Sequence, residues 1–218
     1  SLPIVPDQER LLALDDGRIS ASALRQRFLS PPLWQPEFNG DGLRLRAGPP
    51  RDAAVLMPII VRSSGNTVLL TQRNAHLSQH PGQIAFPGGR RDPEDPSAVS
   101  TALRETEEEV GLSRHHIEVI GELPDYLTGT GYRVRPVVGL IEPGFELRPE
   151  PDEVASVFEV PLAFLMNPSH HQKRIWHNDG TDRTFYAMPY QSPAGGGEYF
   201  IWGATAAMLR NLYRFLSA

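Results

Sequence analysis

Runs of apolar residues separated by polar turns predict a series of β-strands from residue 53 onward. The first two runs, "AAVLMPIIV" and "NTVLLTQR", are joined by a short polar segment with a glycine and are expected to be neighbouring strands. Further strands are expected at "QIAFPGG", "IEVIGEL", "RVRPVVGLI" and "ASVFEVPL", and "QKRIWH" with "RTFYAMPY" is expected to form a hairpin. Strand-forming segments therefore dominate the chain.

Helical spacing of apolar residues predicts helices near both ends of the chain and one in its middle. Near the N-terminus, "ISASALRQRFL" is expected to be a helix capped by Ser20, and "TAAMLRNLYRFLSA" forms the expected final helix with Thr205 as its cap. The middle helix is expected from Pro96 to Val110, with Asp95 as its cap and Gly111 as its terminator. A short helix is also expected at "LAFLMN".

These elements predict one principal domain with an N-terminal extension. Residues 1–50 combine a short helix with "SPPLWQPEFNGDG", whose prolines and glycines break regular structure, and are interpreted as the extension. Residues 51–218, including the C-terminal helix, are interpreted as the domain. Its strands outnumber its helices and do not alternate regularly with them, so an α+β sandwich is favoured over a doubly wound parallel sheet.

Composition and charge narrow the class of protein. The net charge of −5 argues against a protein that works mainly by coating nucleic acid, which needs a basic face. No apolar run approaches the roughly 18 residues of a transmembrane helix, and the N-terminus lacks the pattern of a secretory signal. The absence of cysteine excludes disulfides, thiol nucleophiles and Cys-ligated zinc, and it fits a reducing compartment. A cytoplasmic protein is therefore expected.

The middle helix carries an unusual concentration of negative charge in "ALRETEEEVGL". Glu105, Glu108 and Glu109 are spaced so that they share one helical face, whereas Glu107 points away. Such a cluster is ordinarily a solvated surface, but carboxylates on one stripe are also the hard oxygen ligands that suit Mg²⁺ or Mn²⁺. The glycine turn "FPGG" upstream would let backbone approach a ligand closely.

Together, the glycine turn and the acidic helix resemble the Nudix box. The family pattern is Gly, five residues, Glu, seven residues, then Arg-Glu-apolar-any-Glu-Glu-any-Gly-apolar. Here Gly89 is followed by five residues and Asp95, and eight more precede "RETEEEVGL", which starts at Arg104. The sequence departs from the pattern in having Asp95 in place of Glu, a spacer one residue longer, and Thr106 in place of an apolar residue.

The resemblance implies the Nudix fold, a mixed sheet sandwiched between helices (α/β/α), and a hydrolase acting on pyrophosphate links. It implies that Glu105, Glu108 and Glu109 bind Mg²⁺ or Mn²⁺, with the Gly89 carbonyl as a further ligand. Arg104, together with Glu105 and Glu108, is then catalytic, the arginine orienting Glu105. The acid that steadies Arg104 is left open between Asp95 and its neighbour Glu94.

The preceding stretch "LLTQRNAHLSQHPGQIAFPGG" resembles the additional motif of the coenzyme A pyrophosphatase branch of the Nudix hydrolases. Nine positions fit in register: Leu69, Leu70, Thr71, Arg73, Gly82, Phe86, Pro87, Gly88 and Gly89. Asn74 replaces a small residue and Ser78 replaces a second arginine. Further resemblance to bacterial members extends over roughly residues 50 to 215.

That motif implies a substrate-binding set and a reaction. Arg73, Gly82, Phe86 and Gly88 are expected to bind substrate, with the planar guanidinium of Arg73 on phosphate. The reaction would split coenzyme A or its derivatives into 3′,5′-ADP and 4′-phosphopantetheine, or its acyl form, with divalent ions neutralising the diphosphate oxygens. A box glutamate or a downstream carboxylate would be the general base, and Glu153 is preferred to Glu150 and Asp152 because it adjoins an expected strand.

The remaining candidates receive no chemical role. His76 and His80 are left unassigned, and Arg133 with Arg135, two apart on a strand, are interpreted as solvating one sheet face. Trp176 and Trp202 are expected to pack in the core.

Two alternative functions stay open at this point. A Nudix hydrolase of ADP-ribose, dinucleotides or nucleoside triphosphates would use the same chemistry. A non-catalytic nucleotide-binding module would have lost box carboxylates that this chain retains. The expected partner is a small-molecule nucleotide, with neither nucleic acid nor membrane, and a homodimer is one assembly that the sequence allows.

Overall fold

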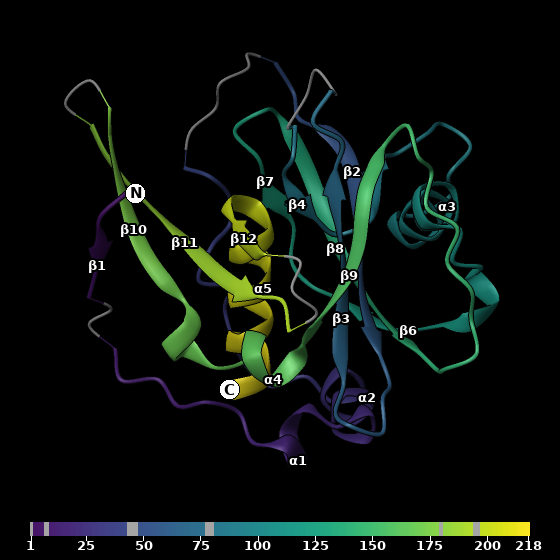
Figure 1. The fold of residues 1–218 in the computed structure, drawn as a ribbon, viewed down its shortest axis with the longest axis horizontal. Helices are drawn as coiled ribbons and strands as arrows, with labels where there is room; N and C mark the ends of the chain where they lie inside the picture. The colour runs from purple at the N-terminus through teal and green to yellow at the C-terminus, as the bar shows by residue number, and fades with distance from the viewer. Residues whose placement is uncertain (1, 7–8, 43–47, 77–80, 179–180, 194–196) are drawn as a thin grey trace.

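A computed structural model describes all residues except 1, 7–8, 43–47, 77–80, 179–180 and 194–196, and it is drawn in Figure 1. Its helices are α1 (Asp16–Ile19), α2 (Ala21–Leu29), α3 (Ala98–Val110), α4 (Leu162–Leu165) and α5 (Gly203–Ser217), with 3-10 turns at Arg114–His116 and Pro168–His170. Its strands are β1 (Ile4–Val5), β2 (Arg51–Ile60), β3 (Thr67–Arg73), β4 (Ile84–Ala85), β5 (Gly88–Arg90), β6 (Ile117–Glu122), β7 (Tyr126–Leu127), β8 (Tyr132–Ile141), β9 (Val154–Pro161), β10 (Gln172–Asn178), β11 (Thr181–Gln191) and β12 (Glu198–Trp202).

The strands form two sheets within the described residues. The larger sheet has the order β4-β3-β2-β8-β6, with β5 added to β2, β7 to β8 and β9 to β3. In it β2 and β8 run parallel, while the other pairs are antiparallel, so the sheet is mixed. The smaller sheet, β1-β10-β11-β12, is antiparallel and contains the expected hairpin as β10 and β11. The mixed α+β fold is confirmed, and the second sheet adds to what the sequence predicted.

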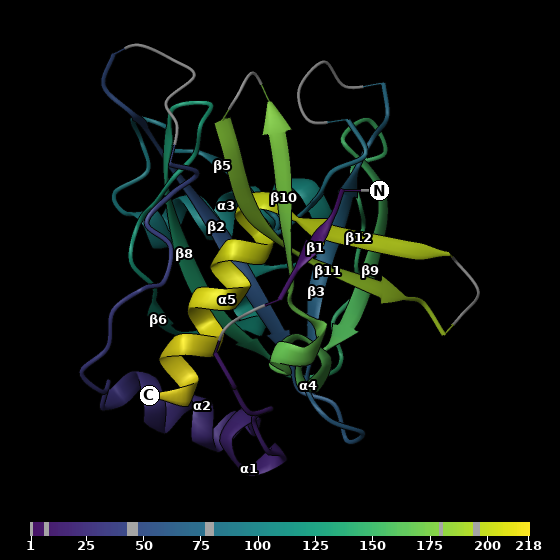
Figure 2. The same ribbon diagram turned by 90° about the vertical axis from the view of Figure 1, so that its left-hand side faces the viewer.

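Helices cover the larger sheet on both faces. The helix α5 lies between the two sheets, and α3 lies on the outer face of the larger one (Figures 1 and 2). Ala102 of α3 packs against Ala54 and Leu56 of β2 and Val137 of β8, which are all fully buried. Because successive strand residues point to opposite faces, the other residues of β2, such as Met57 and Ile59, face the core that contains α5. No helix among the described residues is long and apolar enough to span a membrane.

The N-terminal segment packs closely against the rest of the chain. Ser20 caps α2 as expected, accepting a hydrogen bond from the Ala23 N–H, and Leu24 of that helix is fully buried in the main core. Phe28 presses against the backbone of Gly121, where a Cβ would come within 2.3 Å of its ring. The boundary expected at residue 50 stays a prediction.

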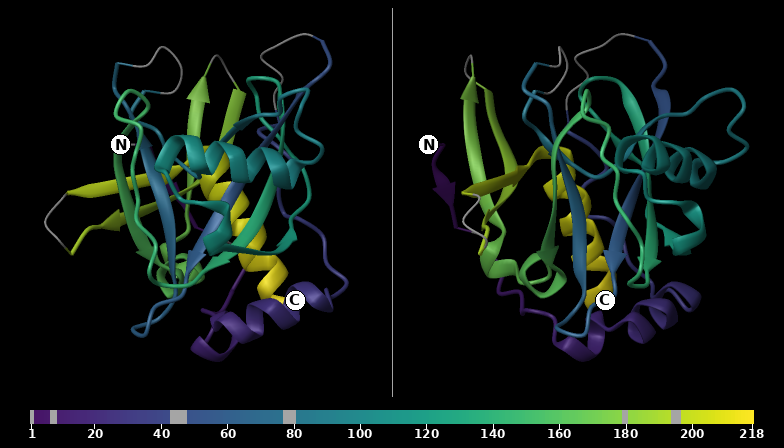
Figure 3. Two further views of the ribbon diagram at one scale, coloured as in Figure 1. Left: turned by 90° about the vertical axis from the view of Figure 1, so that its right-hand side faces the viewer. Right: turned by 45° about the vertical axis from the view of Figure 1, so that its right-hand side comes forward.

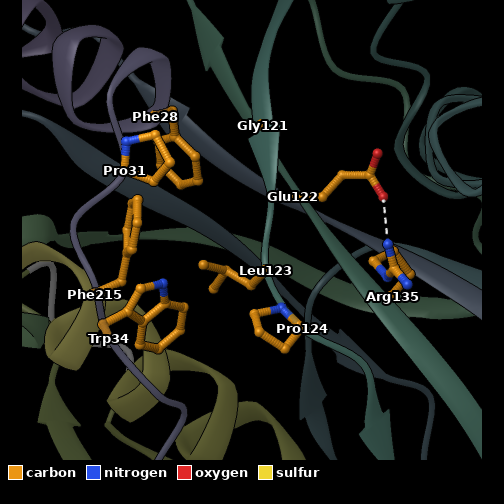
Figure 4. Close-up of a pocket in the computed structure, with 9 residues that line it drawn as sticks. All are labelled: Phe28, Pro31, Trp34, Gly121, Glu122, Leu123, Pro124, Arg135 and Phe215. Atoms are coloured by element: carbon orange, nitrogen blue, oxygen red, sulfur yellow. Dashed lines mark hydrogen bonds and ion pairs between the residues drawn. The ribbon is translucent and has the colours of Figure 1, made fainter.

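A pocket of about 340 Å³ lies where this segment meets the sheet edge. Phe28, Trp34 and Phe215 line its apolar side, and on the opposite side Glu122 forms an ion pair with Arg135 at 3.1 Å. Figure 4 marks this pair with a dashed line. Its lining contains none of the box carboxylates, so it is separate from the acidic helix.

Three local predictions were wrong. The cap of α3 is Ser97, not Asp95, because the Ser97 hydroxyl accepts from the Ser100 N–H while the Asp95 carboxylate is bound elsewhere. The final helix begins at Gly203, so Thr205 lies inside the helix and is not its cap. The Thr205 hydroxyl instead donates to the carbonyl of Ile84 in β4. Trp176 and Trp202 are 46% and 42% exposed, respectively, on the outer face of the smaller sheet.

Candidate active site

Two consecutive glycines bring the backbone of β5 between β2 and α3. Gly88 has φ +154°, and a Cβ there would lie 2.4 Å from the Ala54 carbonyl oxygen and 2.5 Å from the Val55 Cα. At the next position, a Cβ on Gly89 would lie 2.5 Å from the carboxylate carbon of Glu105. The neighbouring strand therefore requires glycine at position 88, whereas at position 89 glycine leaves room for the Glu105 carboxylate against the backbone.

Glu105 and Glu109 are the box carboxylates that face this glycine pair. Their side chains are 18% and 8% exposed. The Gly88 N–H donates to Glu109 Oε2 at 3.2 Å, and the Glu105 carboxylate lies against Gly89. Because α3 ends in a left-handed Gly111 and is anchored through buried Ala102, these two carboxylates are fixed against β5.

Burial makes both carboxylates reluctant to ionise. It raises the pKa of Glu109 to about 7, and the negative charges of Glu105 and Glu153 act in the same direction, against a hydrogen bond from Gly88 and the charge of Arg73. Burial likewise raises the pKa of Glu105, against the nearby Arg104. A cation bound beside these two carboxylates would stabilise their charged forms.

Arg104 is fixed by Asp95, which decides between the two acids that the sequence left open. Its Nη2 lies 2.8 Å from Asp95 Oδ2, and this contact holds the pKa of Asp95 well below the ordinary range. The buried Thr101 hydroxyl also donates to Asp95, at 3.0 Å. From this anchor, Arg104 reaches Glu105 Oε1 at 3.1 Å and the Arg90 carbonyl at 3.1 Å.

Glu108 is placed differently from the other two box carboxylates. It is 59% exposed, and its Oε2 lies 2.8 Å from Arg104 Nη1. An i,i+4 ion pair on the helix surface thus holds Glu108 on the Arg104 side of the site. Glu107 points away as expected and pairs with Arg114 at 2.5 Å.

Arg73 ends β3 beside Glu109, and Glu153 lies in the turn just before the neighbouring strand β9. Arg73 Nη1 is 3.8 Å from Glu109 Oε1, and Arg73 pairs in the sheet with Val154, the residue after Glu153. The Glu153 carbonyl accepts the Asn74 N–H at 2.9 Å. The structure therefore brings the expected phosphate-binding arginine and the expected general base to the same end of the sheet as the box.

Other candidates from the substrate motif lie further from the carboxylates. Gly82 adopts φ +68° in a turn, its N–H donates to the Arg73 carbonyl, and it has open space around it. Phe86 is only 3% exposed and packs in the main core, so the structure does not bring its ring to the surface of the site. His76 is exposed, and Ser78 and His80 lie outside the described residues. Arg133 and Arg135 are paired with acids, Arg133 with Asp52 and Arg135 with Asp125.

The donor set fits a divalent cation in part. Among the described residues, no three carboxylate or imidazole groups converge as a ready-made metal site. Glu105, Glu109 and the backbone of Gly89 nevertheless share one cradle that a side chain at Gly89 would fill. Mg²⁺ typically takes only one or two protein carboxylates and leaves its other positions to water and phosphate, so this set suits it.

Sequence reasoning did not identify two residues at this end of the sheet. Thr101 holds Asp95, and its only sequence signal is its place one helical turn before Arg104. Arg51 begins β2 and carries a side-chain Nε that is buried without a hydrogen-bond partner among the described residues. Its sequence context gives no sign of this, because the partner strand is eighty residues away in the chain.

Comparison with known proteins defines the class. A family model described as the NUDIX domain matches residues 50–180, and the chain belongs to the Nudix family. It is a Nudix hydrolase of the pyrophosphatase class.

The chain is also similar to individual curated relatives and solved structures. The uncharacterized Nudix hydrolase NudL of Escherichia coli K12 is 42% identical over 180 residues, covering 83% of this chain and 88% of the relative. NudL of Shigella boydii serotype 18 is 41% identical with the same coverage. Among solved structures, the Nudix hydrolase RenU of M. smegmatis has a TM-score of 0.46 at 24% identity, over 54% of this chain and 74% of its own. The Nudix domain of Shewanella oneidensis NrtR, solved with ADP ribose, has a TM-score of 0.42 at 21% identity, over 54% and 76%.

Proposed function

We propose that this Nudix hydrolase splits the pyrophosphate link of coenzyme A or its acyl derivatives, releasing 3′,5′-ADP and 4′-phosphopantetheine or its acyl form. The observation that carries the proposal is the segment from Leu69 to Gly89, which resembles the coenzyme A motif and supplies both Arg73 and the glycine pair. Arg73 lies 3.8 Å from Glu109, so a cation suited to phosphate stands beside the buried acid.

In this proposal, different residues of the site bind the metal ion, orient a ligand of that ion and bind the substrate phosphate. Glu105, Glu109 and the Gly89 carbonyl are the groups that would hold Mg²⁺ or Mn²⁺, with Glu108 able to join if it leaves Arg104. When bound, the ion would neutralise the diphosphate oxygens and make water a better nucleophile. Arg104, anchored by Asp95, fixes the orientation of Glu105. Arg73 would bind a phosphate oxygen of the same link.

Glu153 is the proposed general base. Its charge acts on Glu109, which places the two acids in one electrostatic environment, and its backbone is fixed between Asn74 and Glu150. Because these hydrogen bonds fix its backbone, the Glu153 carboxylate can accept a proton from water without a movement of β9.

A substrate panel tests the proposal. Purified protein with Mg²⁺ or Mn²⁺ is assayed against coenzyme A, an acyl-coenzyme A, ADP-ribose, a dinucleoside polyphosphate and nucleoside triphosphates. The expected result is the highest kcat/KM with coenzyme A or its acyl ester, with 3′,5′-ADP as a product. A higher kcat/KM with ADP-ribose, a dinucleotide or a triphosphate would replace the substrate proposal and retain the chemistry. No turnover of any substrate would favour the non-catalytic module.

A further inference from the structure

Arg51, at the end of the larger sheet near the candidate active site, makes no ion pair with an acid among the described residues. Arg51 begins β2, where its N–H donates to the Gly131 carbonyl at 2.9 Å. Its guanidinium lies over the ring of Tyr132, 4.2 Å from the centroid, and its buried Nε has no hydrogen-bond partner among the described residues. The contact with the ring holds the guanidinium in place but supplies no acceptor for this Nε–H among the described residues.

Two neighbouring arginines have acid partners, so the lack of one distinguishes Arg51 from them. Arg133, one position along β8 from Tyr132, lies 2.6 Å from Asp52, and Arg135 lies 2.6 Å from Asp125. In a chain with a net charge of −5, acids are available to neutralise a structural arginine. A guanidinium that is held in place, partly desolvated and without an acid is arranged for an anion that comes from outside.

A second cation shares this face of the sheet. Arg90 of β5 is directly opposite Ala53 of β2, and Ala53 points to the same face as Arg51. The Arg90 side chain is exposed and makes no ion pair among the described residues. Arg51 and Arg90 are therefore diagonal neighbours on adjacent strands, and together they can bind one multiply charged group.

This pair lies close to the acidic helix but on the other face of β2. Gly89, which lies against Glu105, is opposite Ala54, three residues from Arg51, or about 10 Å along the strand. Figure 3 shows α3 crossing the sheet near the end where β2 begins. Among the described strands β5 pairs with β2, so a ligand that contacts both places would run round the free edge of β5.

We propose that Arg51, stacked on Tyr132 and assisted by Arg90, binds the phosphate monoester on the ribose of the substrate. This inference rests on the proposed coenzyme A activity. In that substrate, the diphosphate to be cleaved and the 3′-phosphate are attached to the same ribose. The 3′-phosphate distinguishes coenzyme A from ADP-ribose and from ordinary dinucleotides, so Arg51 would be a specificity-determining residue rather than a catalytic one.

The test compares coenzyme A with 3′-dephospho-coenzyme A, which lacks only that monoester. We expect the wild-type protein to prefer coenzyme A in kcat/KM, and Arg51→Met to reduce that value by about 10- to 100-fold, mainly through KM. Turnover of the dephospho substrate should be unchanged, so the preference disappears. Arg133→Gln, a change to a nearby arginine that already has an acid, is the matched control and should keep the preference. Arg51→Gln serves the same test if the methionine variant does not fold.

The outcomes separate this inference from the proposed function. Equal kcat/KM for the two substrates in the wild type would overturn the role of Arg51 and leave the coenzyme A proposal standing. A preference that persists in folded Arg51→Met or Arg51→Gln would also overturn it. Hydrolysis of neither substrate by the wild type would overturn both.

Discussion

Glu109 is a buried acid whose charge is costly unless a cation accompanies it. Burial raises its pKa to about 7, against the ordinary value of 4.5 that an unfolded chain would have. Between these values the folded state holds a proton that the unfolded state has lost, so the stability of the metal-free protein falls as pH rises through this window. The full difference is about 3 kcal/mol.

Glu109→Gln should therefore abolish turnover and raise the stability of the metal-free fold at pH 8, by an amount up to about 3 kcal/mol. Activity assays and thermal unfolding in a chelator measure the two effects. Glu107→Gln is the control, because Glu107 lies on the same helix but pairs with Arg114 away from the site. It should retain turnover. Full activity in Glu109→Gln would refute the metal assignment.

The same pKa predicts how metal binding depends on pH. A carboxylate must lose its proton to bind an ion, so each unit of pH below about 7 should weaken the apparent affinity for Mn²⁺ by about tenfold, with a plateau above. Calorimetric titration with Mn²⁺ alone between pH 5.5 and 8.5 measures this slope. Glu108→Gln, which changes the exposed acid, should keep the slope. An affinity independent of pH over this range is incompatible with Glu109 as a ligand.

At the scale of elements, the strand β5 depends on two glycines for different reasons. A Cβ at Gly88 would meet backbone of β2, which cannot move aside, whereas a Cβ at Gly89 would meet the end of the Glu105 side chain, which can rotate. Gly88→Ala should therefore destabilise the fold by about 2–4 kcal/mol. Gly89→Ala should fold with little loss but bind Mn²⁺ poorly, because Glu105 is displaced.

Denaturant unfolding and Mn²⁺ titration distinguish the two effects. Gly82→Ala is the control for backbone strain alone, because Gly82 has a positive φ of 68° but open space around it. It should cost about 1 kcal/mol and leave Mn²⁺ binding intact. If Gly89→Ala binds Mn²⁺ as well as the wild type, the cradle formed by Gly89 and Glu105 is not the metal site.

The sequence predicted elements better than it predicted which group each polar side chain contacts. Helical periodicity placed Glu105, Glu108 and Glu109 on one face, but spacing could not show that Glu108 pairs with Arg104 instead of facing β5. The cap expected at Asp95 lies at Ser97 because the buried Asp95 carboxylate holds Arg104. The sequence positions of Glu108 and Asp95 each allow two roles, and only tertiary contacts show which role the side chain takes.

Which face of a sheet is buried was equally hard to predict from sequence. Alternation along a strand separates two faces but does not say which one is covered. Trp176 and Trp202 therefore looked like core residues, yet both lie on the uncovered face of the smaller sheet. Arg51 went unnoticed for a related reason, since its contact with Tyr132 depends on the parallel register of β2 with β8.

At the scale of the whole molecule, a partly buried ion-pair network joins the N-terminal segment to α5. Glu37 accepts hydrogen bonds from Arg210, which is fully buried, and from Arg214. The adjacent Phe38 exchanges two backbone hydrogen bonds with the Asn211 amide. Burial raises the pKa of Glu37, but its two arginines outweigh that effect and leave the pKa below the ordinary value. The network therefore stabilises the fold at neutral pH and loses this contribution as pH falls through the pKa of folded Glu37.

Glu37→Gln should lower the free energy of unfolding at pH 7 by about 2–3 kcal/mol, because it removes the charge that two arginines share, one of them buried. Glu118→Gln is the matched control: Glu118 also ties the N-terminal segment to the sheet, through Arg25, but both side chains are more than 40% exposed. An exposed pair contributes less than about 1 kcal/mol, so this variant should unfold nearly as the wild type does. Denaturant unfolding over a series of falling pH values from pH 7 measures both, and the deficit of Glu37→Gln should shrink as the pH falls through the lowered pKa of folded Glu37. Equal, small losses in the two variants would mean that apolar packing of residues such as Leu24, and not this network, holds the N-terminal segment in place.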